Sequence, residues 1–445
     1  MLALAAFTKL KKLIETRKAT IGICGLGYVG LPLAVATSRG GFKVLGFDID
    51  ESKVIQVNMG QSYLGSVSSD ALVPLVESKR LRVTNNFAEL SACDVIVICV
   101  PTPLTVNREP DLSYVEQTAR AIASCLRSGQ LVVLESTSYP GTTSQVVKPI
   151  LLQTGLIAGQ DFFLGFSPER EDPGNTDFAT ATIPKIVAGE GAEAGELTAL
   201  FYKSVVDRVV VVSSNETAEA VKITENVFRA VNIALVNELK VIFAAMGIDI
   251  WEVIEAAKTK PFGFMPFYPG PGLGGHCIPI DPFYLAWKAR EFGVPTRFIE
   301  LAGEINTAMP HYVINRLVET LDGRSAKTLG AARILILGVA YKKNVSDIRE
   351  SPALKLMELL EKRGAKVDFH DPHVGEMPKT REHPNFTGRR SVPFSAHSLA
   401  AYDAVVVVTD HDCIEYQYLE KAKIVVDTRN ACAKRGLSLS NVVKA

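Results

Sequence analysis

The segment Tyr268–Pro282 holds the residue types that most directly suggest chemistry. It reads Y-P-G-P-G-L-G-G-H-C-I-P-I-D-P, with four glycines, four prolines and single histidine, cysteine and aspartate residues. Glycine and proline at this density exclude a regular helix or strand, so we expect an ordered loop whose backbone closely approaches another group. Asp281 and Pro282 then begin an apolar-periodic run that ends near Gly293. An aspartate cap followed by proline predicts a helix start there.

Cys277 precedes this predicted helix N-terminus, where the positive end of the helix dipole favours a thiolate. The sequence therefore indicates a nucleophilic cysteine, and the alternative is an inert buried thiol, the ordinary fate of a free cysteine. Asp281 has two compatible interpretations, a helix cap and a catalytic carboxylate. His276 is interpreted as an ordered loop residue rather than as a base.

A second candidate group lies on the long helical pattern 214–246. Lys222, Asn226 and Arg229 are spaced i, i+4 and i+7 and therefore share one helix face. The ordinary interpretation is a solvated polar stripe. The functional interpretation is that Lys222 and Asn226, one turn apart, stabilise a negatively charged oxygen during a reaction.

A dinucleotide-binding turn is predicted near the beginning of the chain. The apolar strand 20–24 runs into G-L-G-Y-V-G at residues 25–30, a helix follows, and a second strand ends at Asp48. In this setting the glycines allow a tight turn and close backbone approach, the helix N-terminus binds the pyrophosphate, and the acid binds a ribose hydroxyl, which favours NAD over NADP. Lys53 is either near the adenosine or a solvated helix residue.

Further strand ends place polar residues at the same predicted sheet edge. Strands over 93–100, 131–135 and 161–166 end at Thr102, Thr137 and Glu169. The carboxyl ends of parallel strands line the ligand crevice, so we expect all three residues to face the dinucleotide, although each is also an ordinary turn residue.

The predicted fold is α/β, with two Rossmann-like doubly wound domains joined by a central all-helical domain that contains one long helix. The alternation of strands and helices resumes near Arg333, with strands over 334–337, 366–370, 402–409 and 424–427. We therefore predict a first domain over 1–213, a helical dimerisation domain over 214–328 and a third domain over 329–445. The polar segment 376–392 is expected to be a long surface loop.

Composition narrows the class of protein further. The 48 basic and 48 acidic residues balance among 445, so we predict neither nucleic acid nor an anionic membrane as partner. The seven cysteines are scattered without a C-x-x-C pair, which argues against a metal site and for a reducing, cytoplasmic setting. The apolar runs are too short to span a bilayer, and the N-terminal segment is interpreted as an amphipathic helix rather than a signal peptide.

Taken together, these motifs resemble the UDP-glucose/UDP-N-acetylhexosamine 6-dehydrogenase family over nearly the whole chain. The resemblance rests on G-L-G-Y-V-G (25–30), V-P-T-P (100–103), E-S-T (135–137), F-S-P-E-R (166–170), E-A-V-K-I-T-E-N (219–226), G-G-H-C-I-P-I-D-P (274–282) and G-V-A-Y-K-K-N-V-S-D-I-R-E-S (338–351). The segment 260–277 and the form P-E-R-E-D-P-G (168–174) are most similar to the UDP-N-acetylglucosamine branch. A partner-subunit arginine of the family has no match, and Lys258, Lys260 or Phe262 occupies its region.

The resemblance implies NAD as cofactor, a UDP-sugar as substrate, a homodimer or higher oligomer formed through the central helix, and a role in surface polysaccharide synthesis. It implies catalytic roles for Cys277, Lys222, Asn226, Asp281, Thr137 and Glu169. The cofactor residues it implies are Gly25, Gly27, Tyr28, Val29, Gly30, Asp48, Lys53, Thr102, Thr137 and Arg349. For the substrate it implies Glu169, Arg170, Lys222, Asn226, Tyr268, Gly272, Gly274, Tyr341, Lys342 and Arg429.

Three competing functions are compatible with parts of the same pattern. UDP-glucose or UDP-N-acetylmannosamine could replace UDP-N-acetylglucosamine as substrate. A catalytically dead NAD-sensing scaffold would not need Cys277, Lys222, Asn226 and Asp281 together. A two-electron alcohol or 3-hydroxyacid dehydrogenase would share the first two domains but would need no cysteine.

Overall fold

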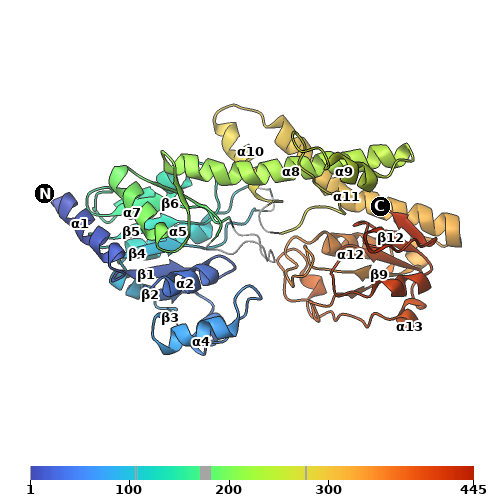
Figure 1. The fold of residues 1–445 in the computed structure, drawn as a ribbon, viewed down its shortest axis with the longest axis horizontal. Coiled ribbons are helices and arrows are strands. Elements are labelled where there is room, and N and C mark those ends of the chain that lie inside the picture. The colour runs from blue at the N-terminus through green and yellow to red at the C-terminus, as the bar shows by residue number, and fades with distance from the viewer. Residues whose placement is uncertain (1, 106, 108, 171–181, 276–277) are drawn as a thin grey trace. The chain divides into compact units, whose positions relative to one another are not determined.

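The computed structural model describes residues 2–105, 107, 109–170, 182–275 and 278–445. The chain forms two compact units (Figure 1). Unit 1 comprises Met1–Glu225 and Phe283–Val294, and unit 2 comprises Asn226–Pro282 and Pro295–Ala445. No helix within the described ranges combines the length and apolar character needed to cross a membrane.

Unit 1 is built on an eight-stranded sheet with the strand order β3-β2-β1-β4-β5-β6-β7-β8. Its strands are β1 (Thr20–Cys24), β2 (Lys43–Phe47), β3 (Leu81–Thr84), β4 (Val95–Ile98), β5 (Leu131–Leu134), β6 (Phe163–Phe166), β7 (Lys185–Gly189) and β8 (Val209–Val211). The central strands are buried along their whole length, as expected for a parallel sheet covered on both faces. Neighbouring strands run parallel except for β6 and β7, which are antiparallel. The predicted doubly wound domain is confirmed, but β3, β7 and this reversal were not predicted.

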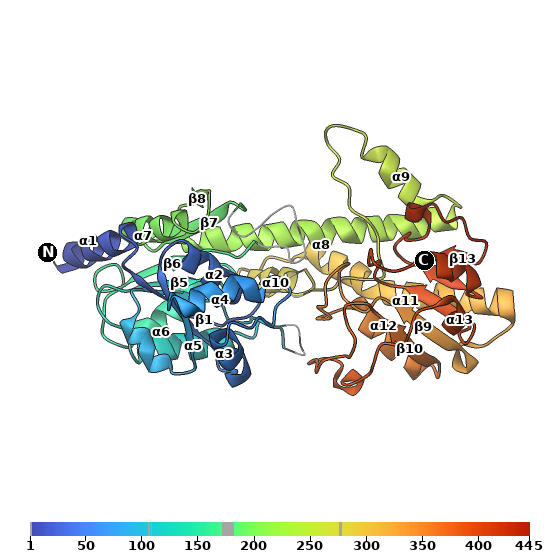
Figure 2. The same cartoon turned by 60° about the horizontal axis from the view of Figure 1, so that its bottom comes forward.

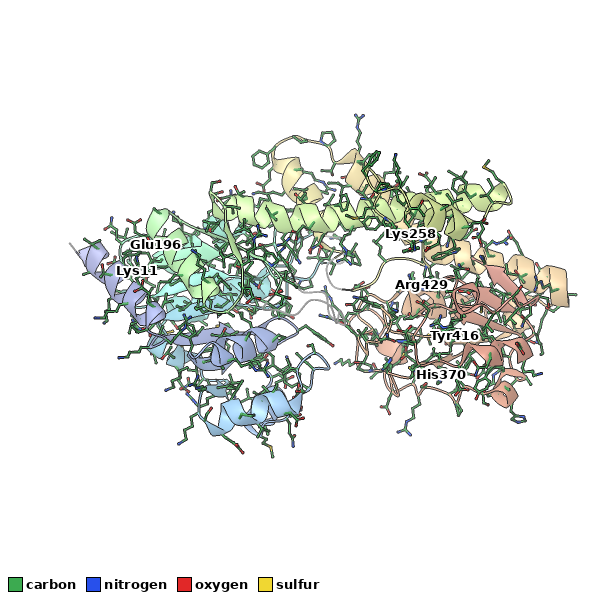
Figure 3. The ribbon with its side chains drawn as sticks, in the orientation of Figure 1. Lys11, Glu196, Lys258, His370, Tyr416 and Arg429 are labelled. Atoms are coloured by element: carbon green, nitrogen blue, oxygen red, sulfur yellow. The ribbon has the colours of Figure 1, made fainter. Side chains whose placement is uncertain are left out.

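Helices cover both faces of this sheet. They are α1 (Leu2–Glu15), α2 (Gly30–Arg39), α3 (Glu51–Asn58), α4 (Ser69–Glu77), α5 (Ser113–Ala123), α6 (Lys148–Leu152) and α7 (Ala192–Lys203). The predicted amphipathic helix at the N-terminus is confirmed as α1, which buries Leu10 and Ile14. An ion pair of 2.6 Å between Lys11 and Glu196 joins its outer side to α7 (Figure 3).

Three helices account for most of the predicted central region. Helix α8 (Asn215–Ala245) contains 31 residues, α9 (Ile250–Ala257) follows it after a short turn (Figure 2), and α11 (Arg297–Ser325) contains Pro310 within its length. Asp249 caps α9 by accepting a hydrogen bond from the Trp251 backbone N–H. The helix predicted after Asp281 is α10 (Asp281–Glu291).

Unit 2 contains a second parallel sheet with the order β10-β9-β11-β12-β13. Its strands are β9 (Arg333–Leu337), β10 (Lys366–His370), β11 (Ala404–Val407), β12 (Val425–Asp427) and β13 (Val442–Lys444). Helix α12 (Pro352–Lys362) lies between β9 and β10 in sequence and buries Leu356, Met357 and Leu360. The predicted second α/β domain is confirmed, with β13 as an additional strand.

The turn after β9 differs from the glycine turn of unit 1. Asp371, directly after β10, accepts hydrogen bonds from the backbone N–H groups of Val339 (2.7 Å) and Ala340 (3.1 Å). The His411 ring nitrogen lies 3.0 Å from the same carboxylate oxygen. Both Asp371 and His411 are buried, so this carboxylate uses its acceptor positions within the protein.

The segment 376–392 is the predicted long loop, mostly exposed and with the short η4 turn (Pro384–Phe386) as its one helical element. Met377 and Phe386 are each only 1% exposed and belong to the core beneath β9 and β10. A bridge joins Glu376 to Arg390. The surface-loop prediction is confirmed for most of the segment, but the two buried apolar side chains that fix it against the sheet were not predicted.

A buried amide network fastens the start of the glycine-rich loop to α8 and α11. Asn237 accepts a hydrogen bond from the Gly270 N–H (3.0 Å) and donates to the Asn306 side-chain oxygen (2.9 Å). Asn306 in turn donates to the carbonyl oxygen of Ala230 (3.0 Å). Asn237 is 0% and Asn306 3% exposed, so these hydrogen bonds have little competition from water.

We predict that Asn237→Ala lowers the free energy of unfolding by about 1–3 kcal/mol, because it leaves a buried N–H and a buried amide oxygen without their partner. Asn232→Ala is the matched control on the same helix. Its side chain is part-exposed and donates to the Phe228 carbonyl within the same helix turn, so its effect should stay within about 0.5 kcal/mol. Urea unfolding measures both; equal effects would contradict the role of the network.

Candidate active site

The glycine turn of unit 1 has the geometry of a pyrophosphate site. Gly25 has φ of +90°, and a Cβ there would lie 2.6 Å from the Cys99 carbonyl oxygen. A Cβ on Gly30 would lie 1.8 Å from the Gly25 carbonyl oxygen, whereas one on Gly27 would meet no atom within 4 Å. The turn is thus closed by backbone contacts at its first and third glycines and open at the second, and it leads into the N-terminus of α2.

Val29, the cap residue of α2, makes no side-chain hydrogen bond to the first turn of the helix. Backbone N–H groups at such an uncapped N-terminus can bind an anion. Tyr28 and Val29 are part-exposed beside the turn. These residues therefore fit the pyrophosphate of NAD, which would bind along the backbone between Gly27 and Gly30.

Asp48 lies at the end of β2, where a ribose-binding acid is expected. Its carboxylate accepts hydrogen bonds from the N–H groups of Leu26 (2.9 Å) and Asp50 (3.0 Å) and pairs with Lys53 at 3.3 Å. Lys53 is therefore not simply a solvated lysine. A carboxylate has about four acceptor positions, so Asp48 retains capacity for a ribose hydroxyl while the Leu26 bond fixes it against the glycine turn.

Three further predicted residues of unit 1 follow strands β4, β5 and β6. Thr102 is 4% exposed, and its carbonyl accepts a hydrogen bond from the Tyr284 hydroxyl of α10. Thr137 is part-buried, and Ser136 beside it donates to the Val100 carbonyl (2.7 Å). Glu169 is part-buried and pairs with Lys185 at 2.8 Å.

Lys222 is carried by the first turns of α8 and is 7% exposed. One turn earlier, the buried Glu219 accepts hydrogen bonds from the Gly141 N–H (2.5 Å), the Thr143 N–H (2.9 Å) and the Thr143 hydroxyl (2.7 Å). These bonds fasten α8 to the segment that follows Thr137 and so fix where Lys222 lies. Burial raises the pKa of Glu219 to about 7, against the effect of its hydrogen bonds.

Arg170 is held by a partner that the sequence did not suggest. Its guanidinium forms a two-pronged contact with Glu225 on α8, at 2.5 and 3.3 Å, and donates to the Pro184 carbonyl. This arrangement uses the planar fork of arginine for a protein carboxylate. A substrate role for Arg170 therefore stays a prediction.

Within unit 2, Asn226 and Asp281 lie together although 55 residues separate them: the Asn226 amide donates to an Asp281 carboxylate oxygen at 2.5 Å. Asn226 is 3% and Asp281 2% exposed, so the polar stripe expected on α8 is not solvated at Lys222 and Asn226. Arg229, by contrast, is exposed. This hydrogen bond explains how the carboxylate of Asp281 can be buried at the start of α10.

The glycine-rich loop packs against the segment after β9. A Cβ on Gly274 would lie 2.7 Å from the Tyr341 side chain, and the Gly275 N–H donates to the Arg349 carbonyl (3.0 Å). Gly272 has φ of +142° and lies against Pro352. The Arg349 guanidinium contacts Asp347 at 2.6 Å, and its predicted approach to NAD stays a prediction.

Arg429 contacts the other end of the same loop. Its Nε donates to the Val408 carbonyl (2.9 Å), and a Cβ on Gly270 would lie 2.6 Å from its guanidinium. Tyr268 stacks on Trp251 at 5.9 Å and donates to Glu255 (2.8 Å). Lys342 is part-buried. Unit 2 thus brings Gly272, Gly274 and Tyr341 together around one loop, and Arg429 to the start of that loop.

Cys277, the predicted nucleophile, and His276 lie outside the described residues, so their roles stay predictions. Several residues that organise the site were missed by sequence reasoning, namely Glu135, Lys185, Glu219 and Tyr284. An acidic residue at the end of an apolar strand, as at Glu135, and a lysine at the start of one, as at Lys185 in K-I-V-A-G, are signals that could have drawn attention to them. Within the described part of the chain, no cluster of three or more potential metal ligands occurs.

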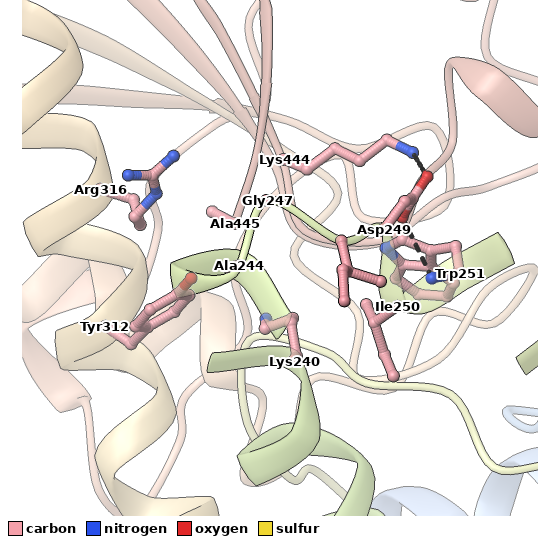
Figure 4. A pocket seen from close by; sticks show the side chains of 11 residues that line it. Lys240, Ala244, Gly247, Asp249, Ile250, Trp251, Tyr312, Arg316, Lys444 and Ala445 are labelled. Atoms are coloured by element: carbon pink, nitrogen blue, oxygen red, sulfur yellow. Dashed lines mark hydrogen bonds and ion pairs between the residues drawn. The ribbon is translucent and has the colours of Figure 1, made fainter. Parts of the chain in front are cut away.

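A cavity of about 280 Å³ in unit 2 contains a buried lysine (Figure 4). It is lined by Lys240, Ala244, Gly247, Ile248, Asp249, Ile250, Trp251, Tyr312, Arg316, Lys444 and Ala445. The Lys240 ammonium lies 5.2 Å from the centre of the Tyr312 ring and 3.5 Å from the Gly270 carbonyl. Burial, and secondarily the charge of Arg429, lowers the pKa of Lys240 to about 7.

We predict that Lys240→Met stabilises the protein most at low pH. The unfolded chain holds the Lys240 proton up to its ordinary pKa of 10.5, whereas the folded chain releases it near 7. Folding of the wild type therefore becomes more favourable as pH rises between these values. The gain in free energy of unfolding on substitution should be several kcal/mol in order of magnitude at pH 6 and much smaller at pH 10.

Urea unfolding of both proteins at the two pH values measures this difference. Lys421→Met, at an exposed position of the same unit, is the control and should give the same small difference at both pH values. A Lys240→Met gain that does not change with pH would contradict a buried lysine with a lowered pKa.

Comparison with known protein families covers all three parts of the chain. Residues 19–206 match the NAD binding domain of the UDP-glucose/GDP-mannose dehydrogenase family, residues 216–308 match its central domain, and residues 335–434 match its UDP binding domain. The middle match spans most of α8, α9, α10 and the glycine-rich loop. The matched ranges lie within the three segments into which the sequence was divided.

Individual relatives are similar over most of their length. The chain is 36% identical to the UDP-N-acetyl-D-glucosamine 6-dehydrogenase of Pseudomonas aeruginosa over 88% of this chain and 90% of that one. It is 35% identical to the UDP-N-acetyl-D-mannosamine dehydrogenase of Pyrococcus horikoshii over 92% of this chain and 95% of that one. A solved structure of UDP-D-ManNAc dehydrogenase from Pyrococcus horikoshii has a TM-score of 0.85 at 32% identity, covering 96% of this chain and 98% of the other.

Proposed function

This chain belongs to the UDP-glucose/GDP-mannose dehydrogenase family, and from that premise we propose that it oxidises C6 of UDP-N-acetyl-D-glucosamine to the carboxylate. The overall change converts one primary alcohol and one water into one carboxylate, with loss of two hydrides and three protons. NAD bound by the first domain supplies the hydride acceptor, and two molecules are reduced for each sugar. The observation that carries the proposal is the buried pair Asn226–Asp281 at the end of the cysteine-containing loop.

The first oxidation requires a proton to leave the C6 hydroxyl. We assign this step to a water held by Thr137 and Asp281. The Asn226 amide donates to one Asp281 oxygen, which fixes the orientation of the carboxylate. Oxidation of the alcohol then gives an aldehyde.

The aldehyde must remain bound while spent cofactor is exchanged. We assign its capture to Cys277, whose thiolate adds to the carbonyl carbon and forms a thiohemiacetal. Lys222 and Asn226, one turn apart on α8, would donate to the oxygen that becomes negatively charged, and both are nearly buried. Such donors stabilise an oxyanion far more in a site without water than in solution.

The second oxidation converts the thiohemiacetal to a thioester, which water must hydrolyse. We assign the orientation of that water to Glu169 at the end of β6, with Asp281 as the other candidate. Hydrolysis returns the Cys277 thiol and releases the carboxylate.

The identity of the sugar is proposed from sequence similarity, and two relatives of this chain are named for different sugars. The segment 260–277 resembles the N-acetylglucosamine branch, and the Pseudomonas aeruginosa relative has that name. The Pyrococcus horikoshii relative is named for UDP-N-acetyl-D-mannosamine at nearly equal identity, which makes that epimer the second candidate. A relative from Staphylococcus aureus named protein CapL supports a role in surface polysaccharide synthesis, and the free cysteines described fit a cytoplasmic setting.

We predict that purified protein forms two NADH for each UDP-N-acetylglucosamine consumed and turns over UDP-glucose and UDP-N-acetylmannosamine more slowly. Absorbance at 340 nm with limiting sugar measures the ratio. Equal or faster turnover of either alternative sugar would overturn the substrate assignment. A ratio of one would instead indicate a simple alcohol dehydrogenase.

Cys277→Ser should lower the rate of carboxylate formation by about 10²-fold or more, because removal of a nucleophile usually costs at least as much as removal of an oxyanion donor. The control is Cys413→Ser, at an exposed free cysteine of unit 2, which should keep the wild-type rate. Product analysis by mass spectrometry separates aldehyde from carboxylate. Wild-type carboxylate formation by Cys277→Ser would refute the covalent mechanism.

We also propose a homodimer formed through α8. Phe228, Leu235 and Ile242 are 48%, 50% and 46% exposed, and their seven-residue spacing places them in one stripe along the helix. A stripe of large apolar side chains on an exposed helix face is typical of a helix–helix interface. A second copy of the chain would bury the same stripe on both partners.

Leu235→Glu should shift the protein from dimer to monomer in light scattering coupled to size-exclusion chromatography, because a charge would be buried at the centre of the stripe. Leu152→Glu, at an exposed leucine of unit 1, is the control and should remain dimeric. A wild-type protein that is monomeric at micromolar concentration would contradict the dimer.

A further inference from the structure

Strand β7, which runs antiparallel to β6, carries a buried lysine at its first residue. Strand β7 pairs antiparallel to β6, with Phe166 opposite Ala188 and Gly165 opposite Gly189. Extending this register beyond the paired residues places Lys185 opposite Glu169. The reversal therefore brings the start of β7 to the edge where β5 and β6 end.

The lysine bridges two carboxylates at that edge. The Lys185 Nζ lies 2.8 Å from Glu169 Oε2 and 3.1 Å from Glu135 Oε1. Lys185 is 4% and Glu135 1% exposed, and Glu169 is part-buried. Glu135 follows β5 directly and Glu169 lies just beyond β6, so the sheet presents two like charges on neighbouring strands.

Two more groups fix the ammonium in this position. The hydroxyl of Tyr202, on α7, donates to Glu135, and the Lys185 Nζ lies 5.4 Å from the centre of the Tyr202 ring. Tyr202 itself is fully buried. The cluster thus has one buried cation for two carboxylates, of which Glu169 is the less buried.

The charges of the cluster depend on one another. Burial opposes the charge of Lys185, but Glu135 and Glu169 outweigh it and raise the pKa of the ammonium above its usual value. Burial raises the pKa of Glu135, against the effect of Lys185. Without the lysine, the buried Glu135 and the part-buried Glu169 would face each other, and the two like charges would favour a proton on one of them.

We propose that Lys185 is a positioning residue that keeps Glu169 ionised and oriented for the hydrolytic water, and that β7 is reversed to deliver it. This inference rests on the proposed function of Glu169. Lys185 acts through Glu169 and needs no contact with the sugar. Glu135 holds the other side of the ammonium, so that the cation cannot follow a moving Glu169 side chain.

The pH dependence of kcat distinguishes this role from a purely structural one. In Lys185→Met the loss of the cation raises the pKa of the Glu169 carboxyl, so the acid limb of the profile should move to higher pH by about one unit or more. Lys185→Arg keeps the charge and should restore most of the wild-type profile. Lys148→Met, which removes the partner of Glu190 elsewhere in the same unit, is the matched control and should leave the profile unchanged.

A double variant keeps the test informative if Lys185→Met does not fold. Glu135→Gln combined with Lys185→Met removes one negative and one positive charge together, a change that buried pairs often tolerate. The pH midpoint of its acid limb should lie between those of wild type and Lys185→Met. If Lys185→Met does not fold, the midpoint of the double variant should still lie above that of wild type. An acid limb identical to wild type in the folded double variant would overturn the proposal.

Glu169→Gln separates failure of the inference from failure of the proposed function. If Glu169→Gln hydrolyses the thioester at the wild-type rate, the assigned role of Glu169 is wrong and the inference falls with it. If Glu169→Gln is slow and Lys185→Met has a wild-type profile, only the role of Lys185 is wrong. A slow Glu169→Gln together with a shifted Lys185→Met and an unshifted Lys148→Met supports the proposal.

Discussion

The hydrogen bond between Asn226 and Asp281 is the contact on which the proposed chemistry of unit 2 depends. A glycine- and proline-rich loop has no regular structure of its own, so its ends must be held by something rigid. Helix α8 does this at both ends, through Asn237 at Gly270 and Asn226 at Asp281. The two asparagines are eleven residues apart, about three helical turns, and so lie on nearly the same face. The helix therefore fixes the distance that the intervening loop must span.

The sheets of unit 1 and unit 2 have similar topologies, but the turns at their strand ends have different binding properties. In the first, the turn after β1 is open at Gly27, and Asp48 uses only part of its acceptor capacity on the Leu26 and Asp50 backbone. In the second, Asp371 is saturated by backbone N–H groups and His411. The first arrangement leaves a helix N-terminus and a carboxylate for a dinucleotide. In the second sheet, protein groups occupy the acceptor positions of Asp371, which corresponds to Asp48. Recognition there is left to side chains of the neighbouring loops.

Local motifs were predictable where one short segment determines both the structure and its chemistry. The glycine turn, the acid after β2 and the helix start at Asp281 follow from residue types within a few positions of each other. The long helix α8 was predictable from its period, and the burial of Lys222 and Asn226 excludes a solvated polar stripe at these two residues. Contacts between distant segments could not be predicted, because nothing in the sequence near Asn226 specifies Asp281 as its partner.

The same limit explains the residues that were missed. Lys185 begins a short apolar run whose direction in the sheet depends on tertiary pairing with β6, and only that pairing places it beside Glu169. The Arg170 guanidinium was expected to bind substrate, but its pairing with Glu225 on α8 depends on where that helix lies. Met377 and Phe386 anchor a segment that is polar on average, so its composition predicted the loop but not these two buried contacts.

The proposed mechanism depends most on one covalent bond, which the Cys277 sulfur forms while the sugar is half oxidised. Glu169→Gln, mixed with UDP-N-acetylglucosamine and NAD and quenched in acid, should accumulate a thioester detectable by intact-protein mass spectrometry. Peptide mapping should place the added mass on the segment that contains Cys277. Formation of two NADH per sugar with no covalent adduct at any quench time, or an adduct on another residue, would contradict the central claim.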